Sequence, residues 1–167
     1  MVKFSYLKKE NFDEIARALF EILANNMDGI APTGNPREDD YKTWYGDVRE
    51  KVINNEVQIV LAIDDASNEI AAFFEYHTTK DTLVMDEIQI AKAYHGKGNV
   101  FRNIYGFVFD NIGTDYLYVE AAANKLNKKS IGVLHTLGLE IVGELHGGGC
   151  AKLKGNFADL LSWYQRK

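Results

Sequence analysis

The sequence predicts one α/β domain of the α+β class, with a mixed, mostly antiparallel twisted sheet and helices on both faces. Strand and helix patterns follow one another in the order β-α-α-β-β-β-α-β-α-β-β, with a late helical turn. Three consecutive strand patterns are typical of an antiparallel meander, and the strand–helix–strand stretch over residues 82–121 predicts a parallel pair. The chain has 167 residues, 46% of them hydrophobic, which is enough to bury one core. We therefore expect a single domain over residues 1–167.

The N-terminal elements follow from simple periodicities. Residues 2–7 alternate between apolar and polar side chains, which predicts a strand. A helix is expected over residues 13–25, because four apolar residues recur there at helical spacing: Ile15, Leu19, Ile22 and Leu23. Residues 26–37 hold both prolines of the chain and predict a loop, and residues 40–53 predict a second helix.

In the rest of the chain, strand and helix patterns alternate more regularly. The remaining expected strands cover residues 58–63, 69–76, 82–90, 116–121, 139–145 and 150–153. The remaining expected helices cover residues 98–111, 127–137 and 157–164. Gly138 ends the second of these helices, and the run of three glycines at 147–149 favours a hairpin turn.

Composition narrows the classes of function. The net charge of −5 argues against a general nucleic-acid binder. No apolar run is long enough to cross a bilayer, and residues 1–9 lack the apolar stretch of a signal peptide, so we expect a cytoplasmic protein that binds no membrane. Cys150 is the only cysteine and has no cluster of metal-ligating residues around it. We expect neither an internal disulfide nor a metal site.

The distribution of charge indicates more than its total. Residues 1–87 carry 18 acidic and 9 basic side chains, whereas residues 88–167 carry 6 acidic and 10 basic ones. No acid occurs over residues 88–109 or 121–139. Those two windows hold six bases: Lys92, Lys97, Arg102, Lys125, Lys128 and Lys129. Such segments favour a phosphorylated ligand, and chance clustering on solvated faces is the alternative.

The stretch over residues 88–102 is the most informative part of the chain. An alternating strand runs into Gly96 and Gly98, which are separated by a lysine, and an amphipathic helix follows at once. A junction of this kind exposes unpaired backbone N–H groups at the positive end of a helix dipole, which suits an anion. We expect that anion to be a pyrophosphate, and the alternative is that the glycines only end a strand and begin a helix.

Two segments resemble sequence motifs of the GNAT N-acetyltransferases. Residues 94–98, Tyr-His-Gly-Lys-Gly, resemble motif A, whose pattern Arg/Gln-x-x-Gly-x-Gly/Ala is matched by His95, Gly98 and Val100. Residues 127–130, Asn-Lys-Lys-Ser, followed by Gly-Leu at 138–139, resemble motif B. The predicted order of elements fits the family as well, so the resemblance spans most of the chain.

The resemblance implies a GNAT-like sheet with a splayed parallel strand pair that holds acetyl-CoA as cosubstrate. The N–H groups of five consecutive residues would bind the pyrophosphate: Gly96, Lys97, Gly98, Asn99 and Val100. The backbones of Ile88 and Ile90 would pair with the pantetheine arm, as an added strand would. Asn127, with Ser130 in the same motif, would hydrogen-bond near the pantetheine or the thioester.

Three positions depart from the family pattern. His95 stands where Arg or Gln is usual, and it can still donate to a phosphate. Val100 replaces Gly or Ala, and its branched side chain narrows the approach to the pyrophosphate unless it turns into the core. Leu134 occupies the position of a tyrosine that is credited with protonating the leaving thiolate, so the resemblance supplies no general acid.

Aminolysis of a thioester needs a deprotonated amine, and a carboxylate can accept the proton. We favour Glu87, just before the cofactor segment, and expect the backbone N–H of Ile90 to polarise the carbonyl. Strict alternation places Asp86 on the side of the isoleucines and Glu87 opposite, whereas a β-bulge would exchange the two faces. Glu75 and Glu120 are further candidates, and for each acid a solvated strand face is the alternative.

The acceptor is expected to enter over the loop at 26–37 and the helix after it. That side is rich in acids: Asp28, Glu38, Asp39, Asp40 and Asp47. Three aromatic residues join them: Tyr41, Trp44 and Tyr45. The combination suits a cationic amine through charge attraction and cation–π contact. The alternative is a solvated helix whose aromatic side chains pack on the core.

These expectations add up to an enzyme that transfers an acetyl group from acetyl-CoA to a primary amine of a small molecule or peptide, by direct attack. The alternative from another class is a catalytically weak CoA-binding sensor or interaction module of the same fold, which the absent tyrosine favours. A flavin- or nucleotide-binding α/β protein is a third hypothesis, and it predicts no stabilisation by CoA. A homodimer is compatible with each.

Overall fold

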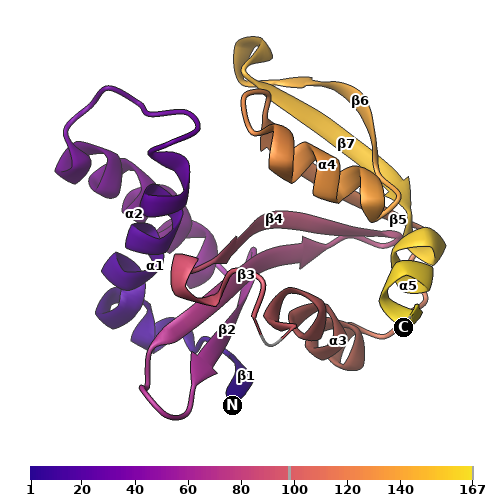
Figure 1. Ribbon diagram of the computed structural model, residues 1–167, viewed down its shortest axis with the longest axis horizontal. Coiled ribbons are helices and arrows are strands. Elements are labelled where there is room, and N and C mark those ends of the chain that lie inside the picture. Colours follow the sequence, from indigo (N-terminus) through magenta and orange to yellow (C-terminus); the bar gives the residue numbers. More distant parts are fainter. Residues whose placement is uncertain (98, 167) are drawn as a thin grey trace. The chain divides into compact units, whose positions relative to one another are not determined.

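The structure is a computed structural model that describes residues 1–97 and 99–166 (Figure 1). Its strands are β1 (Val2–Tyr6), β2 (Gln58–Asp64), β3 (Ile70–Thr78), β4 (Thr82–Ile90), β5 (Tyr118–Asn124), β6 (Glu140–Leu145) and β7 (Cys150–Asn156). Its α-helices are α1 (Phe12–Met27), α2 (Arg37–Ile53), α3 (Val100–Ile112), α4 (Lys128–Thr136) and α5 (Phe157–Gln165). Short 3₁₀ turns are η1 (Lys9–Asn11), η2 (Lys92–Tyr94) and η3 (His146–Gly148). The predicted order of strands and helices is confirmed.

The seven strands form one mixed sheet in the order β1-β2-β3-β4-β5-β7-β6. β1 is antiparallel to β2, and β7 lies antiparallel between β5 and β6. β4 and β5 are parallel, in a register that runs from Thr82–Tyr118 to Met85–Ala121. Both strands continue beyond that register, β4 as far as Ile90. The expected parallel pair in a mostly antiparallel sheet is therefore confirmed.

The chain divides into two compact units whose boundaries fall inside regular elements. Unit 1 comprises Met1–Glu75 and Glu87–Ile104, and unit 2 comprises Tyr76–Asp86 and Tyr105–Lys167. The boundaries cut β3, β4 and α3, so each of these elements contributes residues to both units. A single domain over residues 1–167 remains a prediction.

Unit 1 has a core between α1, α2 and the strands β2 and β3. Phe12, Ala16 and Leu19 recur at helical spacing on α1 and are fully buried. They cluster with Val48 and Val52 of α2 and with strand residues at alternate positions: Ile59 and Leu61 of β2 and Phe73 of β3. α2 begins at Arg37, three residues earlier than expected, because Pro36 precedes it and three acids fill its first turn.

Unit 2 is held together by aromatic contacts between α3 and α5. The ring of Tyr105 meets Trp163 edge-on at 5.4 Å between centroids, and Phe109 meets Phe157 at 5.5 Å and Tyr164 at 5.3 Å. A Cβ at Gly106 would lie 2.3 Å from the Tyr164 hydroxyl oxygen. A larger residue at that position would require the Tyr164 ring to move.

The element boundaries differ from the predictions where backbone geometry intervenes. α3 begins at Val100 rather than at residue 98, because Asn99 has a left-handed backbone with φ of 52°. β7 extends to Asn156 rather than ending at residue 153, because it pairs along the whole of β5. The glycine run forms η3 and a turn between β6 and β7, as expected for a hairpin.

Candidate functional site

The chain turns sharply where β4 ends, and backbone hydrogen bonds fix the turn. The N–H of Ala91 donates to the carbonyl of Ala71 on β3 at 2.8 Å. In η2, Tyr94 N–H donates to Ala91 O at 2.8 Å, and His95 N–H donates to Lys92 O at 3.2 Å. The turn thereby brings the side chain of His95 back to the last residue of the strand.

The carbonyl of Ile90 lies on the edge of β4 that faces away from β3. In a trans peptide the C=O and the following N–H point in opposite directions, and Ala91 N–H points to β3. By strand alternation the N–H of Ile90, and both backbone groups of Ile88, lie on that same outer edge. The Ile90 carbonyl accepts hydrogen bonds from Asn26 Nδ2 at 2.9 Å and from His95 Nε2 at 2.7 Å.

The contact with Ile90 defines the state of His95. Because a carbonyl oxygen can only accept, Nε2 of His95 carries a proton and Nδ1 is the nitrogen left for a further partner. The side chain is exposed. A phosphate that takes its hydrogen bond from Nε2 would have to draw the ring away from the strand.

Among the described residues of the turn after His95, Gly96 and Asn99 have left-handed backbones. Gly96 has φ of +69°, and a Cβ there would have no heavy atom within 4 Å, so the position is open on its outer side. Glycine is required by its backbone angle and not by crowding. Lys97 N–H donates to Tyr94 O at 3.2 Å, and Val100 N–H is 3.5 Å from Lys97 O, a long contact. The prediction for Gly98 lies outside the described residues.

The side chain of Val100 turns into the core, where it is 3% exposed. The branched side chain therefore leaves the outer side of the turn clear.

A tyrosine fastens this turn to the end of β2. The hydroxyl of Tyr94 donates to Asp64 Oδ2 at 2.8 Å, and Asp64 Oδ1 also accepts the N–H of Ala66 at 2.9 Å. These bonds favour the ionised carboxylate, the Tyr94 hydroxyl most strongly, and lower the pKa of Asp64. Tyr94, in the segment that resembles motif A, thus acts here as an anchor.

Glu87 belongs to a chain of side-chain hydrogen bonds that leads to α1. Asn26 Nδ2 donates to Gln89 Oε1 at 2.9 Å, and Gln89 Nε2 donates to Glu87 Oε1. Glu87 and Gln89 therefore share one side of β4. Among the described residues, Asn26 Oδ1 is buried without a hydrogen-bond partner. The sequence pattern did not indicate Asn26, because nothing local relates the end of α1 to β4.

Asp86 has a different partner, which the sequence reasoning missed. Its Oδ2 lies 2.6 Å from Nδ1 of His77 on β3. The hairpin between the strands is closed by Thr79 N–H donating to Thr82 O at 2.9 Å. Counting back from that short turn places residue 77 near residues 84 and 86, so the hairpin itself was the signal that could have found the pair.

In unit 2, Asn127 caps α4. Its Oδ1 accepts the N–H of Ser130 at 3.0 Å, so the two predicted motif B residues are brought together. Leu134, at the position of the absent tyrosine, is 7% exposed. His135 next to it has Nδ1 2.9 Å from Leu139 O, which holds this ring at the end of the helix.

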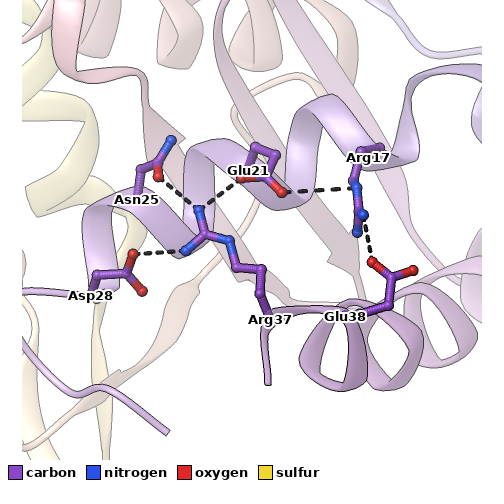
Figure 2. A network of polar contacts seen from close by, with 6 residues as sticks. All are labelled: Arg17, Glu21, Asn25, Asp28, Arg37 and Glu38. Atoms are coloured by element: carbon purple, nitrogen blue, oxygen red, sulfur yellow. Dashed lines mark hydrogen bonds and ion pairs between the residues drawn. The ribbon is translucent and has the colours of Figure 1, made fainter. Parts of the chain in front are cut away.

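The acids and aromatic residues expected to face the acceptor are largely engaged within unit 1. Figure 2 shows Arg37 donating to Glu21, Asn25 and Asp28, and Arg17 donating to Glu38. The Arg17 guanidinium lies 4.2 Å from the ring centroid of Tyr41, so that ring already has a cation over it. Trp44 and Tyr45 pack against Phe12 of the core. Asp39 and Asp47 remain exposed acids of α2.

The predicted residues are thus distributed over the two units. Unit 1 holds seven of them on and just after β4: Glu87, Ile88, Ile90, His95, Gly96, Lys97 and Asn99. Val100, whose side chain is buried, begins α3 in the same unit. Unit 2 holds Asn127 and Ser130. Over residues 1–97 and 99–166 no group of three His, Cys, Asp or Glu side chains could hold a metal ion. Within the same residues, no helix has the length and apolar character needed to cross a membrane.

Comparison with known proteins gives matches at the level of structure only. No family model and no curated protein sequence matches the chain. The PaiA N-acetyltransferase of Thermoplasma acidophilum, solved in complex with coenzyme A, aligns with a TM-score of 0.71 and 11% identity over 93% of this chain and 99% of its own. A GNAT-family acetyltransferase of Staphylococcus aureus Mu50 aligns with a TM-score of 0.69 and 10% identity over 94% and 99%.

The ribosomal-protein-S5-alanine acetyltransferase of Vibrio fischeri aligns with a TM-score of 0.60 and 17% identity, over 95% of this chain and 94% of its own. Identities this low carry the fold and not the activity. The element order, the parallel β4–β5 pair and these alignments together establish that this chain has the GNAT fold.

Proposed function

We propose that the protein is an N-acetyltransferase that moves an acetyl group from acetyl-CoA to a primary amine. One observation carries the proposal: β4 runs beyond its register with β5 and leads, through an open turn, into the N-terminus of α3. The outer edge of Ile88 and Ile90 offers backbone groups to an extended amide chain. The turn at Gly96 offers a helix start to a diphosphate.

The residues of this segment fit such a cosubstrate. The outer side of Gly96 is open, Val100 is buried, and the side chains of His95 and Lys97 are exposed beside the turn. Acetyl-CoA would supply the activated acetyl group as a thioester. The Ile90 carbonyl already accepts two hydrogen bonds, so in this arrangement its N–H is the group left for a ligand. That N–H is our candidate for polarising the thioester carbonyl.

The acceptor is proposed to be a primary amine of a small molecule or peptide, which attacks the thioester directly. Its charge preference would rest on Asp39 and Asp47, the exposed acids of α2, more than on Tyr41 or Asp28. Glu87, hydrogen-bonded to Gln89, is the carboxylate that the sequence favours for taking up the amine's proton.

The cofactor part of the proposal is tested by substituting a glycine in the turn. Gly96→Ala should weaken stabilisation by acetyl-CoA in a thermal-shift titration, because a Cβ would stand between the backbone and a phosphate. The matched control is Gly147→Ala in η3. Gly147 has φ of +66°, close to the +69° of Gly96, and at both positions an added Cβ would have no heavy atom within 4 Å. Both variants carry the same backbone strain, so an equal loss of acetyl-CoA response would contradict the assignment.

The enzymatic part is tested by CoASH release from acetyl-CoA over a panel of primary amines. Turnover with at least one amine is expected. Leu134, buried where a protonating tyrosine would stand, favours the alternative of a CoA-binding sensor or interaction module. Acetyl-CoA binding without turnover on any amine would establish that alternative and reject the enzyme.

A further inference from the structure

We propose that His77, oriented by Asp86, is the base that deprotonates the acceptor amine. The inference rests on the proposed function and assigns the amine's proton to His77 in place of Glu87, the residue that the sequence alone favours. It begins from one contact, the 2.6 Å separation between Nδ1 of His77 and Oδ2 of Asp86.

The contact fixes the tautomer of the imidazole. An ionised carboxylate can only accept a hydrogen bond, so Nδ1 carries the proton that faces Asp86, and in the neutral imidazole Nε2 keeps its lone pair. This is the arrangement in which an acid orients a histidine so that the far nitrogen can act as a base. Asp86 is the positioning residue, and His77 would touch the substrate.

Burial suits these two roles. The Asp86 side chain is 18% exposed, which keeps water from competing for the contact, and the His77 side chain is 36% exposed, which leaves the ring open to a substrate. Both residues lie in unit 2, on strands joined by the hairpin that Thr79 and Thr82 close. The pair is therefore positioned by a hairpin whose two strands are neighbours in sequence.

The place of the pair along β4 is the second argument. Asp86 directly follows Met85, the last β4 residue in register with β5. It precedes Ile88, the first residue proposed to line the thioester arm, by two positions, which is about 7 Å along a strand.

Two of the other histidines, His95 and His135, have contacts that suit this role less well. His95 donates from Nε2 to the Ile90 carbonyl. His135 has Nδ1 2.9 Å from the Leu139 carbonyl and 3.3 Å from Glu140, at the end of α4. The ionisable residues next to the pair along the strands are Tyr76, which precedes His77 on β3, and Glu87, which follows Asp86 on β4. Glu75 lies two residues before His77, and Glu120 of β5 lies in register with Val84 of β4 and 3.8 Å from Lys154.

The proposed step moves two protons and one acetyl group. Nε2 of His77 takes one proton from the ammonium group of the acceptor, which frees the nitrogen lone pair. That lone pair forms the C–N bond to the thioester carbon, and the C–S bond breaks with its electrons on sulfur. The sulfur takes the second proton lost by the nitrogen and leaves as CoASH. The imidazolium then releases its proton to water.

The test compares variants on the amine with the highest turnover, with kcat/KM measured from about pH 5.5 to about pH 9. His77→Ala should lower kcat/KM by a factor on the order of 10² or more and remove the acidic limb of the profile. Added imidazole should restore part of the rate, because the site is open. Asp86→Asn should lower kcat while leaving KM for acetyl-CoA near the wild-type value. His135→Ala, a histidine of similar exposure that also lies beside a carboxylate, should behave as wild type.

Each outcome of this test supports or overturns the inference. A His77→Ala enzyme with the wild-type pH profile, or an acidic limb that disappears in Glu87→Gln instead, overturns the inference while the acetyltransferase activity stands. Absence of CoASH release by the wild-type protein on every amine overturns the proposed function, and the inference with it. If His77→Ala melts below the assay temperature, His77→Gln is read in the same way.

Discussion

The hydroxyl of Tyr94 connects the turn after β4 to the end of β2, and one atom can be removed to test it. Tyr94→Phe deletes the hydrogen bond to Asp64 and leaves the ring in place. We expect a lower urea midpoint at pH 7 and weaker acetyl-CoA binding, because the turn loses its anchor. The measurement is denaturant unfolding alongside a thermal-shift titration.

The pH dependence of this variant follows from the direction of the Asp64 pKa. The Tyr94 hydroxyl, and then the Ala66 N–H, lower the pKa of Asp64 in the folded protein. A lowered carboxyl pKa contributes stability above the unfolded value of about 3.9, and that contribution is lost as the pH falls through the folded value. The deficit of Tyr94→Phe should therefore shrink below about pH 3. An equal deficit at pH 7 and at low pH would show that the hydroxyl acts without the carboxylate.

At this scale the sequence predicts features that are local. Ile88 and Ile90 lie on β4 as the strand pattern predicts, and Gly96 has the left-handed backbone of a glycine turn. Asn26 could not be predicted, because its hydrogen bonds to Gln89 and Ile90 span more than sixty residues. A contact of that kind depends on tertiary packing.

At the scale of elements, α4 depends on a residue that also belongs to the candidate site. Asn127 Oδ1 caps the helix by accepting the N–H of Ser130. Asn127→Ala should cost about 1 kcal/mol of stability, because that N–H loses its partner. Asn127→Asp keeps a capping oxygen but removes the amide donor, so it should retain the stability of the wild type and bind or use acetyl-CoA less well.

Urea unfolding and acetyl-CoA kinetics on the two variants separate the roles. Full activity in Asn127→Asp would reduce Asn127 to a helix cap and remove it from the catalytic residues.

Elements were predicted where a periodicity ran over many residues, as in the amphipathic helix α1 and the strand β4. Their ends were missed where one backbone angle decides, as at Asn99, or where pairing extends a strand, as in β7. The fold also changes the interpretation of the acidic face expected on α2. Composition shows that acids are present, but only the fold shows that Arg17 and Arg37 neutralise several of them.

At the scale of the whole molecule, the placement of the unit boundaries bears on cooperativity. Because β3, β4 and α3 each run through both units, neither unit can unfold without breaking elements of the other. We expect one unfolding transition, as a single domain requires. The two tryptophans report on the units separately, since Trp44 packs on Phe12 and Trp163 packs on Tyr105.

Trp163→Phe and Trp44→Phe each leave one fluorescent probe. Their urea transitions should each coincide with the transition followed by circular dichroism of the same variant. A Trp44 transition displaced from that of the secondary structure would divide the chain into two domains.

The fold class, the element order and the parallel pair were all predictable, because they follow from patterns along the chain. The insertion of β7 between β5 and β6 was not, because a strand's neighbours depend on long-range pairing. The site divides in the same way. Its backbone part is encoded in one contiguous segment, whereas its candidate base, His77 with Asp86, arises from the packing of two strands.

The two hydrogen bonds on the Ile90 carbonyl have a consequence for solubility. A strand that continues beyond its neighbour exposes backbone acceptors, and such an edge is a template on which a strand of another chain can add. Asn26 and His95 occupy the acceptor at the end of that edge in the free protein. The segment proposed to receive a narrow extended ligand is thereby protected, at the carbonyl of Ile90, against self-association into larger sheets.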